Sequence, residues 1–211
     1  RDSSTSRGLG DVYKRQRKID GLENSFFRMI AQSLYDKTYD LEYRVQTYEP
    51  YREINDLATE MKTSGYNPFE NPTGIYFKDG EEAVVILGNT NGEQVNLKVY
   101  DFDAIRQGQR TPDPTSYPLS EGINKLRIAH GGLSYIEYYT PNWKTAPALK
   151  LHIASGKVNG YYDKHRDVSA DWREILNKAT YGCIDIKGDR VNLVFGVNSI
   201  KTCLLYTSPS P

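Results

Sequence analysis

The sequence predicts a mainly β fold with flanking helices. N-terminal helices come first, then an antiparallel β-sandwich of jelly-roll-like type, then the start of a truncated α/β region. Two observations carry this prediction. From about Pro72 onward, helical spacing of apolar residues gives way to about seven short β-rich runs separated by turn residues. Near Asp167 the pattern changes again, to one helix followed by two short strands.

The two ends of the chain have an unusual relationship. Back-translated and reverse-complemented, Ser6–Gln16 encodes Cys203–Pro211 in a frame shifted by one base. Such antisense copies have no folding rationale, and they resemble a sequencing adapter joined to both ends of a DNA insert. We therefore interpret residues 1–16 and 203–211 as translated adapter, and Arg17–Thr202 as an open reading frame cut at both ends. We expect residues 1–16 to make few long-range contacts, whereas Cys203–Thr207 could add to a sheet edge.

Residues 17–70 form the predicted helical and extended lead. Apolar residues at helical spacing predict a helix over Glu23–Tyr35 and a second over Tyr51–Lys62. Between them, Tyr39–Tyr48 alternates apolar and polar residues, which is typical of a half-buried extended segment.

Residues 71–166 form the predicted sandwich. Turn residues such as Gly, Asn and Asp separate its β-rich runs. The predicted strands are Gly74–Phe77, Ala83–Leu87, Gln94–Tyr100, Asn124–Ala129, Leu133–Thr140, Leu149–Ala154 and Gly160–Tyr162. The longest predicted loop is Asp103–Tyr117.

Residues 167–202 open a second region. Ser169 is expected to cap a helix that runs to about Thr180, and strands are expected at Cys183–Ile186 and Val191–Phe195.

Charge and composition exclude several classes of function. The chain has 27 basic and 27 acidic residues, and leaving out the adapter-like ends gives a net charge of about −2 without a basic patch. We therefore expect no nucleic-acid partner. No apolar run is long enough to predict a transmembrane helix. Cys183 is the single cysteine of Arg17–Thr202, which rules out a disulfide framework there. We expect a monomer.

The residues with catalytic or metal-binding potential form no recognisable motif. His130, His152 and His165 lack partners at metal-binding spacing, and no serine-hydrolase elbow or nucleotide-binding loop occurs. Asp101 and Asp103 could hold calcium with a third oxygen, but two Asp residues one apart are a weak signal on their own, and a plain loop entrance is the favoured interpretation.

Aromatic residues provide the candidate binding residues. Without Tyr13 and Tyr206, 15 of the 17 tyrosines remain. We consider Trp143, Tyr135 and Tyr139 candidates for glycan binding, because aromatic rings can stack on pyranose faces. The alternative, which the composition favours, is that the tyrosines simply cover sheet faces.

Six separated blocks occur in an order that matches a known family. The blocks are Asn71–Phe77, Gly80–Val85, Tyr117–Lys125, Gly132–Tyr139, Ala154–Tyr162, and Asp171-Trp172 with Leu176. Together they resemble the enhancin-like zinc metallopeptidases, family sixty of the metallopeptidases, and in particular Bacteroides-type members that act on mucin-like O-glycoproteins. The resemblance covers Phe26–Phe195.

The resemblance implies a function for the parent protein. It implies that the helical lead and sandwich are the non-catalytic N-terminal part of a secreted or surface zinc peptidase, and that residues 167–202 begin its catalytic region. Zinc in that family is held by an H-E-x-x-H motif and a distal Glu, which this chain lacks. The resemblance therefore gives no catalytic residue and no cofactor to this chain, which we expect to be inactive. Mucin-like glycoproteins or glycans are the implied partners of the parent. A stand-alone carbohydrate- or glycoprotein-binding sandwich and a purely structural or adhesive surface domain are the alternatives.

Overall fold

The computed structural model describes residues 14–63, 71–108, 114–189 and 191–207. The chain divides into two units, Arg1–Leu41 and Glu42–Pro211. In the first unit, residues 14–20 are helical and α2 spans Ser25–Tyr35. The side chain of Asn24 caps α2 by accepting hydrogen bonds from the amides of Phe26 and Phe27. The helix predicted over Glu23–Tyr35 is thus confirmed.

The adapter-like ends are only partly described. Residues 1–13 lie outside the described part of the chain, so the expectation of few long-range contacts is untested for them. In the first unit Nε2 of Gln16 donates a hydrogen bond to Oε1 of Gln32. At the other end, α7 spans Val197–Thr207, so the backbone of Cys203–Thr207 is helical. The expectation that this segment could join a sheet edge was wrong.

The second unit begins with three short elements. They are α3 (Leu41–Arg44, whose first residue belongs to the first unit), β1 (Val45–Tyr48) and α4 (Ile54–Glu60). The extended segment predicted over Tyr39–Tyr48 is therefore a strand only in its second half. The helix predicted over Tyr51–Lys62 is shorter than expected, because the backbone of Glu53 is extended and acts as its N-cap.

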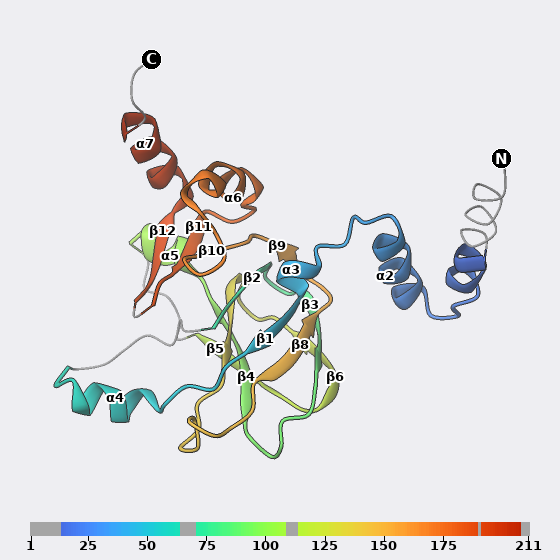
Figure 1. Cartoon of the computed structure of the whole chain (residues 1–211), viewed down its shortest axis with the longest axis horizontal. Coiled ribbons are helices and arrows are strands. Elements are labelled where there is room, and N and C mark those ends of the chain that lie inside the picture. The colour runs from blue at the N-terminus through green and yellow to red at the C-terminus, as the bar shows by residue number, and fades with distance from the viewer. Residues whose placement is uncertain (1–13, 64–70, 109–113, 190, 208–211) are drawn as a thin grey trace, which may run out of the picture. The chain divides into compact units, whose positions relative to one another are not determined.

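Two antiparallel sheets form the sandwich (Figure 1). One has the strand order β1-β8-β3-β6, where β8 is Leu149–Ile153, β3 is Glu82–Leu87 and β6 is Gly122–Arg127. The other has the order β5-β4-β7-β2-β9, where β5 is Thr115–Leu119, β4 is Val95–Tyr100, β7 is Gly132–Glu137, β2 is Pro72–Phe77 and β9 is Lys157–Val158. Every pair within these two sheets is antiparallel, as the sequence predicted.

The core lies between the two sheets because alternate residues of each strand point inward. Strand β4 shows this pattern most clearly, with Val95, Leu97 and Val99 buried and their neighbours partly exposed. Residues from both sheets join one apolar cluster, which includes Ile75, Phe77, Val85, Leu97, Ile136, Leu151 and Ile153. Burial of this apolar surface is the main force that stabilises the sandwich.

A smaller sheet follows the sandwich. Its order is β10-β11-β12, with β10 at Tyr162–Asp163, β11 at Cys183–Lys187 and β12 at Asn192–Gly196, and β10 pairs with β11 in parallel. The 3-10 turn η1 (Ser169–Asp171) leads into α6 (Trp172–Lys178). Ser169 therefore lies inside a turn and does not cap the helix as predicted. The mixed strands and helices agree with the predicted α/β character of this region.

The small sheet packs against the outer face of β7. Cys183 of β11 joins Leu133 and Tyr135 of β7 in an apolar cluster. The side chain of Asn159 is wholly buried beside this contact, where its Oδ1 accepts from the amides of Thr180 and Tyr181. Strand β7 is consequently covered on both faces.

Two arginines connect distant parts of the second unit. Arg44 donates hydrogen bonds to the carbonyl oxygens of Ile153, Ser155 and Gly156 at 3.0–3.2 Å. The guanidinium of Arg166 lies 5.2 Å from the ring centre of Tyr43 and 4.8 Å from that of Tyr161, in the range of cation–π contacts. In the part of the chain that the structure describes, no helix is long and apolar enough to cross a membrane.

Candidate functional site

The loop between β7 and β8 holds the indole of Trp143 at the surface. Thr140 begins the loop, accepting a hydrogen bond from the Asn142 amide at its Oγ1 and one from the Trp143 amide at its carbonyl. The carbonyl of Asn142 then accepts from the amides of Thr145 and Ala146 at 2.8 and 2.9 Å. These bonds satisfy the loop backbone locally, so the loop has a defined shape.

Backbone pairing brings a second segment to this loop. The amide of Tyr51 donates to the carbonyl of Tyr138 at 2.8 Å, and the amide of Thr140 donates to the carbonyl of Tyr51 at 3.1 Å. Tyr51 and Tyr139 form a parallel bridge as a result. The next residue, Arg52, is therefore held beside the Trp143 loop.

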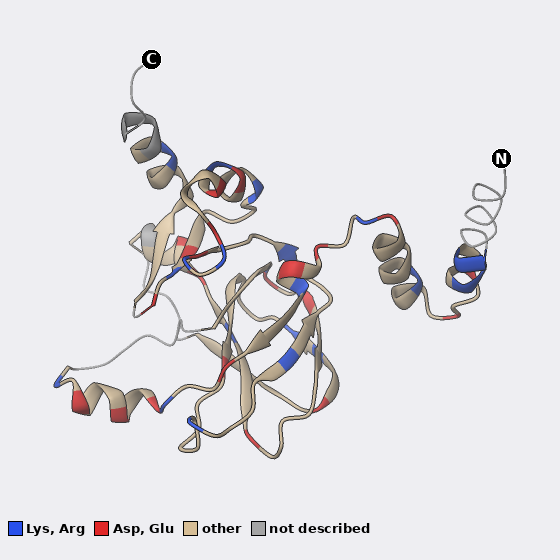
Figure 2. Ribbon diagram, viewed as in Figure 1, with Lys and Arg blue, Asp and Glu red and all other residues tan. Residues whose placement is uncertain are grey.

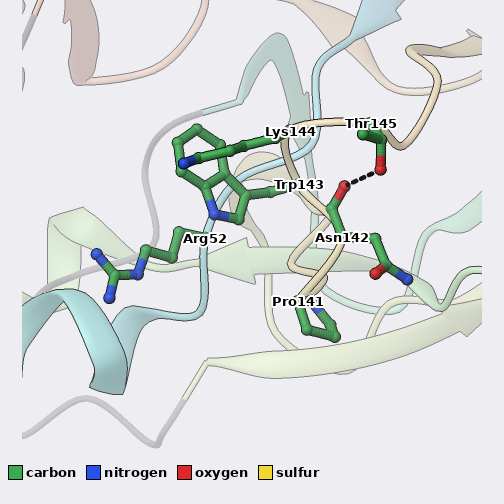
Figure 3. A pocket seen from close by; sticks show the side chains of 6 residues that line it. All are labelled: Arg52, Pro141, Asn142, Trp143, Lys144 and Thr145. Carbon is green, nitrogen blue, oxygen red and sulfur yellow. Dashed lines mark hydrogen bonds between the residues drawn. The ribbon is translucent and has the colours of Figure 1, made fainter.

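A pocket of about 460 Å³ opens at this point (Figure 3). We call it the Trp143 pocket, and its lining residues are Arg52, Pro141, Asn142, Trp143, Lys144 and Thr145. Trp143 is 38% exposed. The ammonium of Lys144 lies 5.4 Å from the indole centre, and Figure 3 shows the two side chains together. Arg52 forms an ion pair with Glu60 of α4.

The structure does not bring the three predicted glycan-binding residues together. Trp143 lines the pocket, whereas neither tyrosine does. Tyr135 is completely buried, its hydroxyl donates to Oδ1 of Asp185 at 2.5 Å, and its ring packs edge-on against Tyr100. A ring without exposed surface cannot stack on a sugar, so Tyr135 has to be removed from the candidate site. Tyr139 is partly buried next to the pocket, where its backbone pairs with Tyr51.

The sequence did not point to the two cations of the pocket, Arg52 and Lys144. Lys144 adjoins Trp143 in the sequence, so an aromatic-cation pair could have drawn attention to it. Arg52 is distant in sequence and reaches the pocket only through the Tyr51 bridge, which no local pattern indicates.

The other candidate groups have structural partners. Oδ1 of Asp101 caps α5 (Phe102–Arg106) by accepting from the amide of Ala104, and it also accepts from the hydroxyl of Tyr181. Burial, with a smaller contribution from the charge of Arg44, lowers the pKa of the partly buried His152. His165 is exposed, and its Nε2 lies 2.8 Å from Oδ1 of Asp189.

Zinc does not fit the described residues. Among them, no group of three or more His, Cys, Asp or Glu side chains lies close enough together to hold a metal ion. Zinc requires several such ligands in tetrahedral geometry.

Comparison with known proteins identifies the family. Residues 41–153 match the N-terminal domain of M60-like peptidases. The chain belongs to this family. A search of the curated proteins gave no match.

Solved metallopeptidase structures share the fold of this M60-like chain. A metallopeptidase from Bacteroides thetaiotaomicron is 30% identical with a TM-score of 0.75, and the alignment covers 92% of this chain and 33% of that one. A metallopeptidase in complex with Tn antigen is 29% identical with a TM-score of 0.69, with 79% and 32% covered. The ZmpB metallopeptidase from Clostridium perfringens, at 14% identity, 79% and 37% coverage and a TM-score of 0.63, supports the fold alone.

The chain corresponds to one part of these longer metallopeptidases. The chain spans about a third of the length of the two more similar structures. The match shows that this chain contains the N-terminal, peptidase-associated domain of the M60-like family and that this domain has a β-rich fold.

Proposed function

We propose that this chain is the non-catalytic N-terminal portion of a secreted or surface-attached zinc metallopeptidase that acts on mucin-like O-glycoproteins. In this proposal the sandwich supports the catalytic domain and substrate engagement. The match of residues 41–153 to the M60-like N-terminal domain carries the proposal. The Tn antigen bound by one of the similar metallopeptidases supports an O-glycoprotein as the substrate class.

Residues 167–202 are proposed to begin the catalytic region. Residues 71–166 contribute every strand of the two sandwich sheets except β1, which lies before them at Val45–Tyr48. The small sheet is attached to the sandwich through a buried contact between β11 and β7. On β12, Leu193 and Phe195 are 43% and 47% exposed, and nearby Val191 is 59% exposed. Adjacent exposed apolar side chains are typical of a surface that packs against another part of a protein. This exposure supports a continuation of the region in the parent.

The test compares this chain with a longer product of the same gene. We expect a chain that extends through an H-E-x-x-H motif to bind zinc stoichiometrically and to cleave a mucin-type O-glycoprotein, since a bound zinc ion can activate water. The 211-residue chain should do neither. Stoichiometric zinc with proteolysis by the 211-residue chain, or a parent gene without any zinc motif, would overturn the proposal.

A second candidate function is glycan binding by the sandwich itself. The observation that favours it is the exposed indole of Trp143 in a pocket whose lining is otherwise mostly polar. We expect the 211-residue chain to bind immobilised mucin-type glycoprotein and Trp143→Ala to abolish that binding. Ile123→Ala is a matched control, because Ile123 is also an exposed apolar residue, 61% exposed on β6, outside the pocket. Equal binding by both variants would remove this function.

A further inference from the structure

The Trp143 pocket combines an aromatic surface with positive charge. Among the residues that the structure describes, its lining contains one indole and two cations, Arg52 and Lys144, and no acidic residue. The remaining lining residues, Pro141, Asn142 and Thr145, are uncharged. An indole offers a flat apolar face to the C–H face of a pyranose, whereas cations bind an anionic sugar more strongly than a neutral one because charge-assisted hydrogen bonds are the stronger ones. The charges therefore indicate more about the ligand than the indole does.

Lys144 is placed where it would meet a charged substituent of a sugar on the indole. Its ammonium lies 5.4 Å from the ring centre of Trp143. The ring attracts the ammonium over one of its faces, which keeps Lys144 beside the indole, so a pyranose would have to stack on the opposite face. The ammonium carries three N–H donors and no acceptor, so it favours anionic oxygen atoms.

Arg52 contributes a second set of donors from another segment. Its Nη1 pairs with Glu60, whose side chain is 63% exposed. A guanidinium has five N–H donors in a planar fork, so a single carboxylate contact at Nη1 leaves further donors for a carboxylate or sulfate. Figure 2 shows the acidic residues of α4 beside this segment. The Glu60 carboxylate therefore competes with an anionic ligand for the guanidinium of Arg52.

Backbone hydrogen bonds hold in place the two segments that carry the cations. The Tyr51 bridge holds Arg52 beside the loop, and the Asn142 carbonyl ties the loop to the amides of Thr145 and Ala146. At the far end, the hydroxyl of Tyr138 donates to the carbonyl of Pro147 at 3.0 Å. A preorganised pocket loses less conformational entropy on binding than a mobile loop.

We propose that the Trp143 pocket binds an anionic sugar, with the pyranose on the indole and a carboxylate or sulfate between Arg52 and Lys144. This inference rests on the second candidate function and specifies its ligand class. An anionic-sugar site in the Trp143 pocket would place the recognition of acidic glycans on the N-terminal domain, separate from any catalytic zinc.

The experiment measures binding of the 211-residue chain to three versions of one mucin-type core disaccharide: neutral, sialylated and sulfated. We expect both anionic versions to bind about tenfold more tightly than the neutral one, which is the effect of one charge-assisted hydrogen bond. The preference should shrink at high salt, because the pocket is open to solvent. A preference for only one anionic version would identify the acid group.

Variants separate the contribution of charge from that of the indole. Trp143→Ala should abolish binding of all three sugars. Arg52→Gln combined with Lys144→Gln should leave the neutral sugar unaffected and remove the anionic preference. Glu60→Gln is the matched control, because it breaks the same ion pair but keeps Arg52, and it should strengthen anionic binding. Lys150→Gln, which removes an exposed lysine on β8 outside the lining, should change nothing.

The possible failures are distinguishable. Equal binding of neutral and anionic sugars, or an anionic preference that survives the double variant, would overturn this inference and leave glycan binding in place. Failure of the wild-type chain to bind any of the three sugars would overturn both. Neither result bears on whether the parent is a zinc peptidase.

Discussion

The hydroxyl of Tyr135 on β7 donates a 2.5 Å hydrogen bond to Oδ1 of Asp185 on β11, and both side chains are buried. This bond joins the sandwich to the small sheet through their shared interior. Burial raises the pKa of Asp185 to about 7, and the Tyr135 hydrogen bond opposes that rise. The carboxyl therefore titrates near neutral pH inside the fold.

The first prediction concerns Asp185→Asn and the pH dependence of stability. An unfolded Asp titrates near pH 3.9, so the folded state holds a proton between about pH 4 and 7 that the unfolded state has lost. The contribution of Asp185 to stability is therefore complete below about pH 4 and is lost as the pH rises to about 7. Asn does not titrate, so the difference in unfolding free energy, variant minus wild type, should increase by about 4 kcal/mol between pH 4 and pH 8.

Urea unfolding of both chains across this pH range checks the prediction. The measured quantity is the difference in unfolding free energy, variant minus wild type, plotted against pH. The cost of burying the Asn amide is the same at every pH, so it shifts this curve up or down without changing its slope. A difference curve that is flat from pH 4 to 8 would mean that Asp185 is already ionised in the fold.

The second prediction concerns Tyr135→Phe, which removes the hydroxyl and keeps the ring. The buried carboxyl of Asp185 then loses the Tyr135 donor, at a cost of about 1–3 kcal/mol. Because that hydrogen bond lowers the pKa of Asp185, its loss should raise this pKa further, and an NMR titration of the carboxyl carbon would measure it. In an Asp185→Leu background, which has no acceptor for the Tyr135 hydroxyl, the substitution should cost less, as a double-mutant cycle would show. Equal costs in the two backgrounds would contradict the coupling.

The third prediction concerns Arg166→Lys. The guanidinium lies against Tyr43 and Tyr161, pairs with Glu42 and Asp167 at 3.0 and 2.8 Å, and donates to the carbonyl of Tyr161. Lysine keeps the charge but has no planar fork, so we expect a loss of about 1–2 kcal/mol. Thermal unfolding measures it, with Lys164→Arg as a control at an exposed neighbouring cation. A melting temperature equal to wild type would show that charge alone suffices at this position.

The fourth prediction concerns Gly132→Ala at the start of β7. A Cβ atom there would lie 1.9 Å from the carbonyl oxygen of Tyr100, so β4 and β7 would have to separate. Gly92→Ala is the matched control: its φ is also positive, at +85°, but nothing lies within 4 Å of its Cβ. We expect the control to lose about 1–2 kcal/mol from backbone strain and Gly132→Ala to lose considerably more, as soluble yield and urea unfolding would show. Equal losses would mean that the strands shift without cost.

Much of the fold could be predicted because the strands carry their own signals. β-Branched runs and turn residues located β3, β4 and β11 to within a few residues. The sequence places Thr115–Tyr117 of β5 in the predicted loop Asp103–Tyr117, because this loop contains Pro112, Pro114 and several polar residues. Strand β5 also contains Pro118, which has no backbone N–H. In the structure β5 is an edge strand, where a missing amide is tolerated.

The candidate site was harder to predict because the exposure of an aromatic side chain depends on which element covers that face of its sheet. The glycan-binding hypothesis requires the ring of Tyr135 to lie on an exposed face of its strand. The small sheet covers that face instead, and only tertiary structure reveals it. Trp143 could be recognised as a loop residue, whereas Arg52 reaches the pocket through the bridge between Tyr51 and Tyr139.

Arg44 sets a practical boundary for recombinant versions of this domain. Its three hydrogen bonds end on carbonyl oxygens more than a hundred residues later in the chain, at Ile153, Ser155 and Gly156. A truncated product that starts at the first strand of the sandwich would lack Arg44, and these partly buried oxygens would lose a charged donor. An expression clone should therefore begin before Glu42, which also keeps the acidic partner of Arg166.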